Sequence, residues 1–208
     1  MTRKAIRSDI RDNLNDAGIT YYSDSDINDA IQDAYNEIVS RTFCFVKSLD
    51  VDWDSKIYWD FINDADATDY MGTVAIFNTN TNLWLRDDLS LRDFDRIRKN
   101  WETWIGAPQF WAPHSLKYVA IAPYYTSPSG TFKLVYWALP PTLAGDSDSP
   151  LIATDMQSLF EYYCTADLLE TAQEITKATI YWAKYEKDIP KYKARCINMA
   201  KTDLLLRV

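Results

Sequence analysis

The stretch SDSDINDAIQDAYNEI, residues 23–38, decides the fold of the N-terminal region. Ser23 is followed three residues later by Asp26, a capping-box pattern that marks a helix start, although the acid is shorter than the usual Glu. Apolar residues then recur on one helical face: Ile27, Ala30, Ile31, Ala34, Tyr35 and Ile38. The pattern predicts an amphipathic helix over about residues 24–41, with a stripe that other parts of the chain must cover.

A second helix is expected just before it, over residues 3–17. Its apolar positions are four, four and three residues apart, and Gly18 is expected to end it; they are Ile6, Ile10, Leu14 and Ala17. Because the turn between the two helices is short, residues 1–42 are expected to form a helical hairpin.

After residue 43 the apolar period changes from helical to alternating. Apolar residues alternate with acids at Leu49, Val51 and Trp53, which is the pattern of a strand with one face exposed to solvent. Further strands are expected over residues 56–62, 73–77, 83–85, 116–122 and 131–138, the last two as a pair, with one helix near 90–104 and an irregular loop over 106–113. Seven of the eight Trp lie here, so residues 43–140 are interpreted as a Trp-rich β insertion.

Helical patterns return after the loop at 145–150, in residues 141–208. One helix is expected from Thr154 to about Gln173 and a second from Ile175, which Pro190 should break or kink before a last helical stretch, 191–206. The predicted fold class is α+β: N-terminal and C-terminal helices form one bundle, the β insertion lies between them in the sequence, and the chain is one structural unit.

Composition excludes several classes of protein. In 208 residues, 47% are hydrophobic and 25% charged, as in ordinary globular proteins, and the net charge of -8 disfavours general nucleic-acid binding. The cysteines Cys44, Cys164 and Cys196 are too far apart for a zinc motif or a disulfide framework. No export signal or membrane-length apolar stretch is recognised, so synthesis in a cytoplasm is expected.

No catalytic motif is found. The sequence lacks GxGxxG, GxxxxGK, GxSxG and HExxH, and five Gly are too few for a phosphate cradle. The single histidine, His114, is expected to be a packed or surface residue, although pairing with one of the cysteines stays open. We therefore expect no enzyme, no catalytic residues, no cofactor and no metal site.

Carboxylates cluster in three places. A calcium loop starting at Asp24 would need Gly where Asp29 stands and Glu where Tyr35 stands, so a helix cap is preferred. The other acids are interpreted as a wet strand face or a solvated loop, and a glycosidase-like acid pair stays the third-ranked function. The clusters are Asp24, Asp26 and Asn28; Asp50, Asp52 and Asp54; and Asp64, Asp66 and Asp69.

Two binding interpretations compete with a purely structural one. Exposed Trp in the insertion could stack on sugars as a carbohydrate-binding module, although core or subunit-interface packing is favoured for such large side chains. Arg92, Arg96 and Lys99 share one predicted helix face and could touch phosphate, but neighbouring acids favour a mixed solvated surface.

Residues 23–38 resemble the start of head-to-tail adaptor proteins of tailed bacteriophages, also called connector or head-completion proteins. The order of later features is similar: Trp111-Ala112-Pro113, Ile121-Ala122-Pro123, Val135-Tyr136-Trp137, Pro140-Pro141, an acidic turn before Pro150, then a helix pair. The long Trp-rich insertion departs from compact members of that family.

The resemblance implies a structural virion protein in the neck, between capsid vertex and tail. Subunits would form a ring, commonly of twelve, beneath the portal protein, extend the DNA channel without binding DNA specifically, and provide a platform for tail proteins. No membrane is involved. The alternative in the same particle is a tail-tube or tail-terminator component, expected to be mostly β without terminal helices.

The C-terminal segment is the candidate partner-binding site. Residues 174–208 carry a net charge of +4, on a body of -12. Docking on the portal or a neighbouring subunit is predicted for Lys191, Lys193, Arg195, Lys201, Leu204, Leu205, Leu206 and Arg207. A terminal helix packed on its own bundle is the equally weighted alternative.

Overall fold

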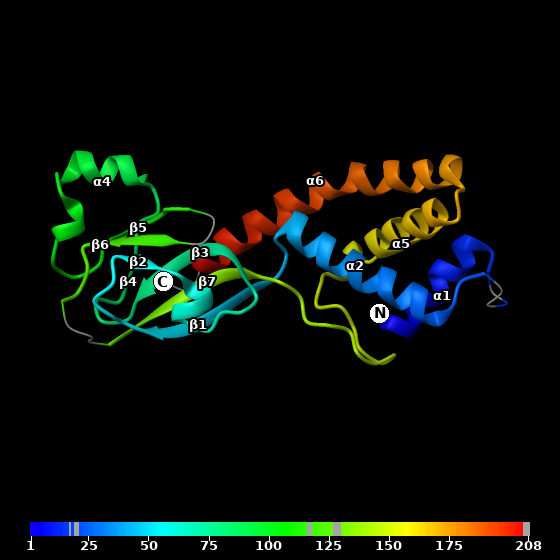
Figure 1. The fold of residues 1–208 in the computed structure, drawn as a ribbon, viewed down its shortest axis with the longest axis horizontal. Coiled ribbons are helices and arrows are strands. Elements are labelled where there is room, and N and C mark those ends of the chain that lie inside the picture. The colour runs from blue at the N-terminus through cyan, green and yellow to red at the C-terminus, as the bar shows by residue number, and fades with distance from the viewer. Residues whose placement is uncertain (17, 19–20, 116–117, 127–129, 206–208) are drawn as a thin grey trace. The chain divides into compact units, whose positions relative to one another are not determined.

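The computed structural model describes residues 1–16, 18, 21–115, 118–126 and 130–205, with side chains up to Ala200. The predicted α+β class is confirmed: the two ends of the sequence form helices, and its middle forms antiparallel sheets (Figure 1). Contacts divide the chain into two compact units, a helical unit of Met1–Phe45 with Leu139–Val208 and a β unit of Val46–Ala138.

The helical unit contains α1 (Arg3–Leu14), α2 (Asp24–Thr42), α5 (Ser158–Thr171) and α6 (Ile175–Leu205). α5 packs against the other three helices, and α2 also packs against α1 and α6 (Figure 1). The predicted stripe of α2 is buried completely at Ile27, Ile31, Tyr35 and Ile38. The stripe is therefore covered by helices more than a hundred residues away in the sequence.

Local side-chain caps set the starts of α1 and α2, at Thr2 and Ser23. The capping box of α2 is present, with the Ser23 hydroxyl accepting from the Asp26 N–H at 3.2 Å. The expected end of α1 at Gly18 is wrong: Asn15 adopts the left-handed conformation (φ 54°) and ends the helix after Leu14. Asn tolerates this conformation better than most residues, so Gly is not needed there.

The C-terminal helices differ from the sequence prediction in two places. Thr154–Met156 form a 3-10 turn, η2, so α5 starts at Ser158. Pro190 lies inside α6, which continues through it to Leu205. Ile189 and Tyr192 are both buried beside the proline. Their packing offsets the roughly 3 kcal/mol that an internal proline costs a helix.

The β unit contains two antiparallel sheets. One has the order β1 (Val46–Asp52), β7 (Thr131–Ala138), β3 (Tyr70–Asn78), β4 (Leu83–Trp84), and the other β2 (Tyr58–Trp59), β6 (Val119–Ala122), β5 (Phe110–Pro113). The expected pairing of residues 116–122 with 131–138 is wrong, because β6 pairs with β2 and β5 whereas β7 pairs with β1 and β3. The predicted loop over 106–113 contains β5, and the predicted strand over 56–62 is cut short by α3 (Phe61–Asp64).

The helix predicted near 90–104 is shorter than expected. α4 spans Leu91–Ile97, and after a break the 3-10 turn η1 covers Trp101–Thr103. Asn100, in the left-handed conformation (φ 60°), separates the two. The break lets Phe94 and Trp101 both pack on Phe110 and the alanines of β5 and β6. Aromatic packing therefore outweighs the helical periodicity here.

Trp59 lies at the centre of the aromatic core of the β unit. Its ring centroid is 5.2 Å from that of Phe132, 6.1 Å from that of Phe61 and 6.3 Å from that of Trp53. Trp59 belongs to β2 and Phe132 to β7, so this cluster joins the two sheets. The alternation predicted along β1 is confirmed, since Val51 is buried between exposed Asp50 and Asp52.

Candidate interaction surfaces

The single histidine, His114, lines an open hollow together with Tyr58 and Glu102. It is exposed at the end of β5, with its ring 4.5 Å from that of Tyr58. The Tyr58 hydroxyl donates to the Glu102 carboxylate. Burial, with the Glu102 charge beside it, raises the pKa of Tyr58 to about 12, so this phenol is a poor general base at neutral pH.

Several of the carboxylates singled out in the sequence have structural partners. Asp24 binds the Arg11 guanidinium at 2.6 Å, and Asp26 is held in the capping box. Asp64 pairs with Lys56 at 2.8 Å, and Asp69 with Lys47 and the Tyr136 hydroxyl. Within the described ranges, no group of three or more His, Cys, Asp or Glu is arranged to hold a metal ion.

A buried ion pair ties α1 to the turn that follows it. The Arg11 guanidinium lies 3.1 Å from the Asp16 carboxylate, and both residues are buried. Asp16 also accepts the backbone N–H groups of Tyr21 and Tyr22. The Asp16 carboxylate thus has one cation and two backbone N–H groups as local partners, so the cluster is structural.

The Trp side chains do not form an exposed platform. All eight lie in described residues; four are buried and the other four are half-buried. The buried ones are Trp53, Trp59, Trp101 and Trp111. The core interpretation therefore accounts for them better than sugar stacking does.

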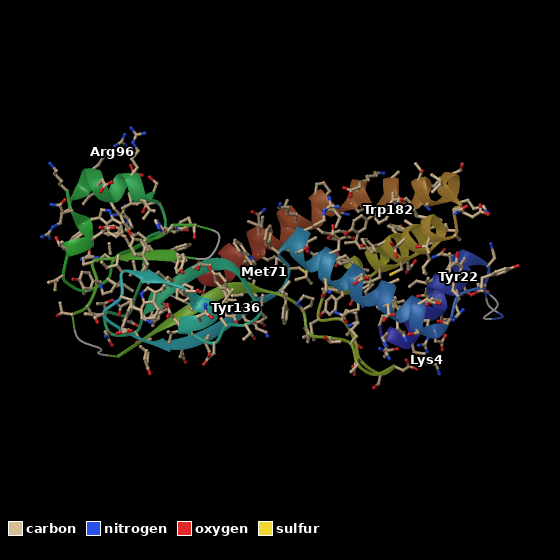
Figure 2. The ribbon with its side chains drawn as sticks, viewed as in Figure 1. Lys4, Tyr22, Met71, Arg96, Tyr136 and Trp182 are labelled. Atoms are coloured by element: carbon tan, nitrogen blue, oxygen red, sulfur yellow. The ribbon has the colours of Figure 1, made fainter. Side chains whose placement is uncertain are left out.

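The predicted phosphate-contacting face does not form a cationic surface. Arg96 projects from α4 into solvent (Figure 2) and pairs with Asp93 at 3.3 Å. Arg92 and Lys99 line an open hollow of about 720 Å³ together with Asp95 and Glu102. Because opposite charges balance in it, the hollow has no preference for phosphate.

The first residues of the candidate C-terminal segment contact other parts of the helical unit in the same chain. The Tyr192 hydroxyl donates to the Asp155 carbonyl at 2.6 Å, and Arg195 pairs with the Asp155 carboxylate. The Lys193 ammonium lies 5.1 Å from the Phe43 ring centroid. Lys191 is exposed. The side chains of Lys201, Leu204 and Leu205, and Leu206 and Arg207 entirely, lie outside the described residues.

Two cysteines that are 152 residues apart in the sequence meet in the helical unit. Cys44 follows α2 and Cys196 lies on α6, and their thiols share a hydrogen bond that lowers the pKa of Cys44 to about 7. Sequence spacing carries no signal for this contact. Cys164 is fully buried, which raises the pKa of its thiol, and donates to the Ala30 carbonyl at 3.3 Å.

A lysine stripe, defined as Lys177, Lys184, Lys187 and Lys191, runs along one side of α6. All four are exposed, and 56% of Ile180 is exposed between the first two. The spacing of seven, three and four residues places them on one side of the helix. Among the described residues, only Lys177 of these four has a carboxylate within ion-pair distance, Glu174 at 3.2 Å. Sequence analysis missed this stripe, although the seven-residue spacing was visible.

An acidic surface, defined as Asp29 and Asp33 of α2 with Asp167 and Glu170 of α5, lies elsewhere on the same unit. Burial and the charges of Asp33 and Glu170 raise the pKa of Asp167. Glu170 accepts the Trp182 indole N–H at 2.9 Å; Figure 2 labels Trp182 on α6. In the described part of the chain, no cation pairs with any of the four. Their mutual repulsion is therefore left uncompensated within the subunit.

A family model described as SU10 adaptor protein matches residues 1–203. The chain belongs to the SU10 adaptor protein family. Membership confirms the resemblance to phage head-to-tail adaptors and identifies the chain as a bacteriophage structural protein that associates with other virion proteins. A comparison with curated proteins gives no match.

The match includes the Trp-rich β unit as well as the helical unit. The β insertion, which departs from compact adaptors, is therefore part of the SU10 adaptor pattern. A structural adaptor role agrees with the ion pairs that Arg11 makes with Asp16 and Asp24, which hold the N-terminal helices together. None of the helices, over the ranges described, is both long and apolar enough to cross a membrane.

Proposed function

We propose that this SU10 adaptor is a subunit of a ring, commonly of twelve copies, in the virion neck. The ring would lie beneath the portal, extend the DNA channel and provide the platform to which tail proteins attach. The observation that carries this proposal is the family match, which extends over both compact units.

The helical bundle supports an adaptor over the alternative tail-tube or tail-terminator component. That alternative is expected to be mostly β, whereas α1, α2, α5 and α6 form a compact unit with its own core. A net charge of -8 further suits a channel through which DNA slides without being held, because like charges repel phosphate.

Reconstruction of the virion neck by cryo-electron microscopy tests the ring directly. The expected result is a symmetric ring below the portal whose density fits the α1, α2, α5 and α6 bundle. If the chain is found in the tail or is missing from the particle, the proposed function is wrong.

The C-terminal segment is proposed to dock on the portal. Deleting residues 197–208 removes its end but retains Ile189, Tyr192 and Arg195, which pack on the bundle. We expect the truncated chain to keep its helical circular dichroism but to lose co-purification with the portal. Unchanged co-purification would show that residues 197–208 are not the portal contact, without affecting the ring proposal.

A further inference from the structure

The lysine stripe of α6 has no described carboxylate partner along most of its length. The Lys184 ammonium lies 4.8 Å from the Tyr181 ring centroid and 5.6 Å from that of Tyr162, and the Lys191 ammonium lies 5.3 Å from that of Tyr192. Among the described residues, no carboxylate lies within ion-pair distance of Lys184, Lys187 or Lys191. Glu186, which is on the same helix, is held by Arg41 on another side of α6. Asp188, four residues after Lys184 and three before Lys191, adds one carboxylate to this side of the helix, so the lysines stay in excess and an opposite charge from outside would stabilise them.

The acidic surface has the complementary charge and a matching spacing. Asp29 and Asp33 are four residues apart on α2, and Lys187 and Lys191 are four residues apart on α6, so each pair spans about 6 Å along its helix axis. Asp167 and Glu170 extend the negative surface onto α5. Both surfaces belong to one compact unit, and each chain carries one of each.

We propose that the lysine stripe of one subunit docks on the acidic surface of a second copy of this chain. Because the two surfaces differ, the contact is head-to-tail and generates a ring when its rotation closes. Exposed Ile180 adds an apolar contact within the stripe. This inference rests on the proposed ring and identifies the surfaces that would join its subunits.

Duplex DNA is the competing occupant of a lysine stripe. Two observations favour a second copy instead. Among the described residues, no cation pairs with the acidic surface of the same unit, and exposed Ile180 places an apolar side chain between the lysines of the stripe. Backbone phosphates would leave both features without a partner.

A charge-swap experiment in assembled particles tests this contact. One variant carries Lys184→Glu and Lys187→Glu, and the other carries Asp29→Lys and Asp33→Lys. Each alone places like charges across the contact, so we expect at least about tenfold fewer copies per particle, measured by quantitative mass spectrometry. Co-expression of the two variants pairs each reversed surface with its complement and should restore incorporation to near the level of the unmodified chain.

Matched controls separate the contact from net charge and from misfolding. Lys4→Glu with Lys133→Glu changes the net charge by the same amount and sign as the lysine variant, at two other exposed lysines, and should leave incorporation unchanged. The thermal midpoints of both swap variants, measured on purified chains, should stay within a few degrees of that of the unmodified chain, because all four positions are exposed.

The remaining outcomes are distinguishable. Normal incorporation of both variants would overturn this contact while the ring proposal stands. If the lysine variant is missing from particles and co-expression of the aspartate variant does not restore it, the stripe binds DNA or another virion protein. That result would also overturn the proposed contact between subunits. Absence of the unmodified chain from the neck would instead contradict the proposed function itself.

Discussion

The helical unit and the β unit reach stability by different means. In the helical unit, aliphatic stripes such as Ile27, Ile31 and Ile38 are buried between helices, and charges are arranged around them, as in the Arg11–Asp16 pair. In the β unit, stacked and edge-on rings around Trp59 and Phe132 join two small sheets. The contrast shows that periodicity describes the first unit well, whereas the second depends on contacts that no local pattern encodes.

Replacing the central ring of the β unit should have the largest effect. Trp59→Ala removes a buried side chain that touches Trp53, Phe61 and Phe132, so we expect a loss of about 3–5 kcal/mol in the free energy of unfolding. Tryptophan fluorescence in a denaturant titration suits this measurement, because seven of the eight Trp lie in the β unit.

The control for that change is Leu83→Ala, in the same unit, where 65% of the side chain is exposed. Its expected effect is within about 0.5 kcal/mol. Equal losses for the two variants would contradict the aromatic cluster as the centre of this unit. A matching loss of helical circular dichroism in Trp59→Ala would show that the two units unfold together.

The helical unit should be most sensitive at its buried ion pair. Arg11→Met leaves the Asp16 carboxylate, 3% exposed, without its cation, and we expect a loss of about 3 kcal/mol. Far-UV circular dichroism during thermal unfolding measures it, since most helix lies in this unit. Asp146→Asn breaks exposed pairs with Arg3 and Arg7 and should cost less than about 1 kcal/mol. Equal effects would mean that burial does not matter here.

A smaller, pH-dependent effect is expected at Asp167 on the acidic surface. Its folded pKa is raised by burial, Asp33 and Glu170, so the protonated form is favoured in the folded state and stability is lost as pH rises through that pKa. Asp167→Asn should therefore raise the free energy of unfolding at neutral pH, by less than about 1 kcal/mol because the site is half-exposed and screened, and thermal unfolding at several pH values measures it. The two proteins should converge in acid, and a constant difference at all pH values would refute the electrostatic origin.

Sequence reasoning succeeded where signals were local. The Ser23–Asp26 capping box and the stripe of α2 are present as predicted, because both depend on residues within a few turns of one another. Helix ends were less predictable. Asn15 ended α1 before Gly18, and Pro190 did not interrupt α6, since neighbouring buried side chains outweighed the cost of the proline.

The candidate surfaces were predictable only in part. The positive charge of the C-terminal region was evident, but Lys193 and Arg195 contact Phe43 and Asp155 of the same chain, which sequence distance concealed. The docking role predicted for the segment from Lys191 to Arg207 stays a prediction.

By itself, the sequence determined the helical hairpin, the alternation along β1 and the resemblance to phage adaptors. All three depend on the spacing of residues that are close together in the sequence. Tertiary structure alone decided the pairing of β6 and β7 with different partners, the meeting of Cys44 with Cys196 and the side of α6 left exposed. The physical reason is that strand pairing and burial depend on which distant segments exclude water together, and spacing along the chain does not encode that choice.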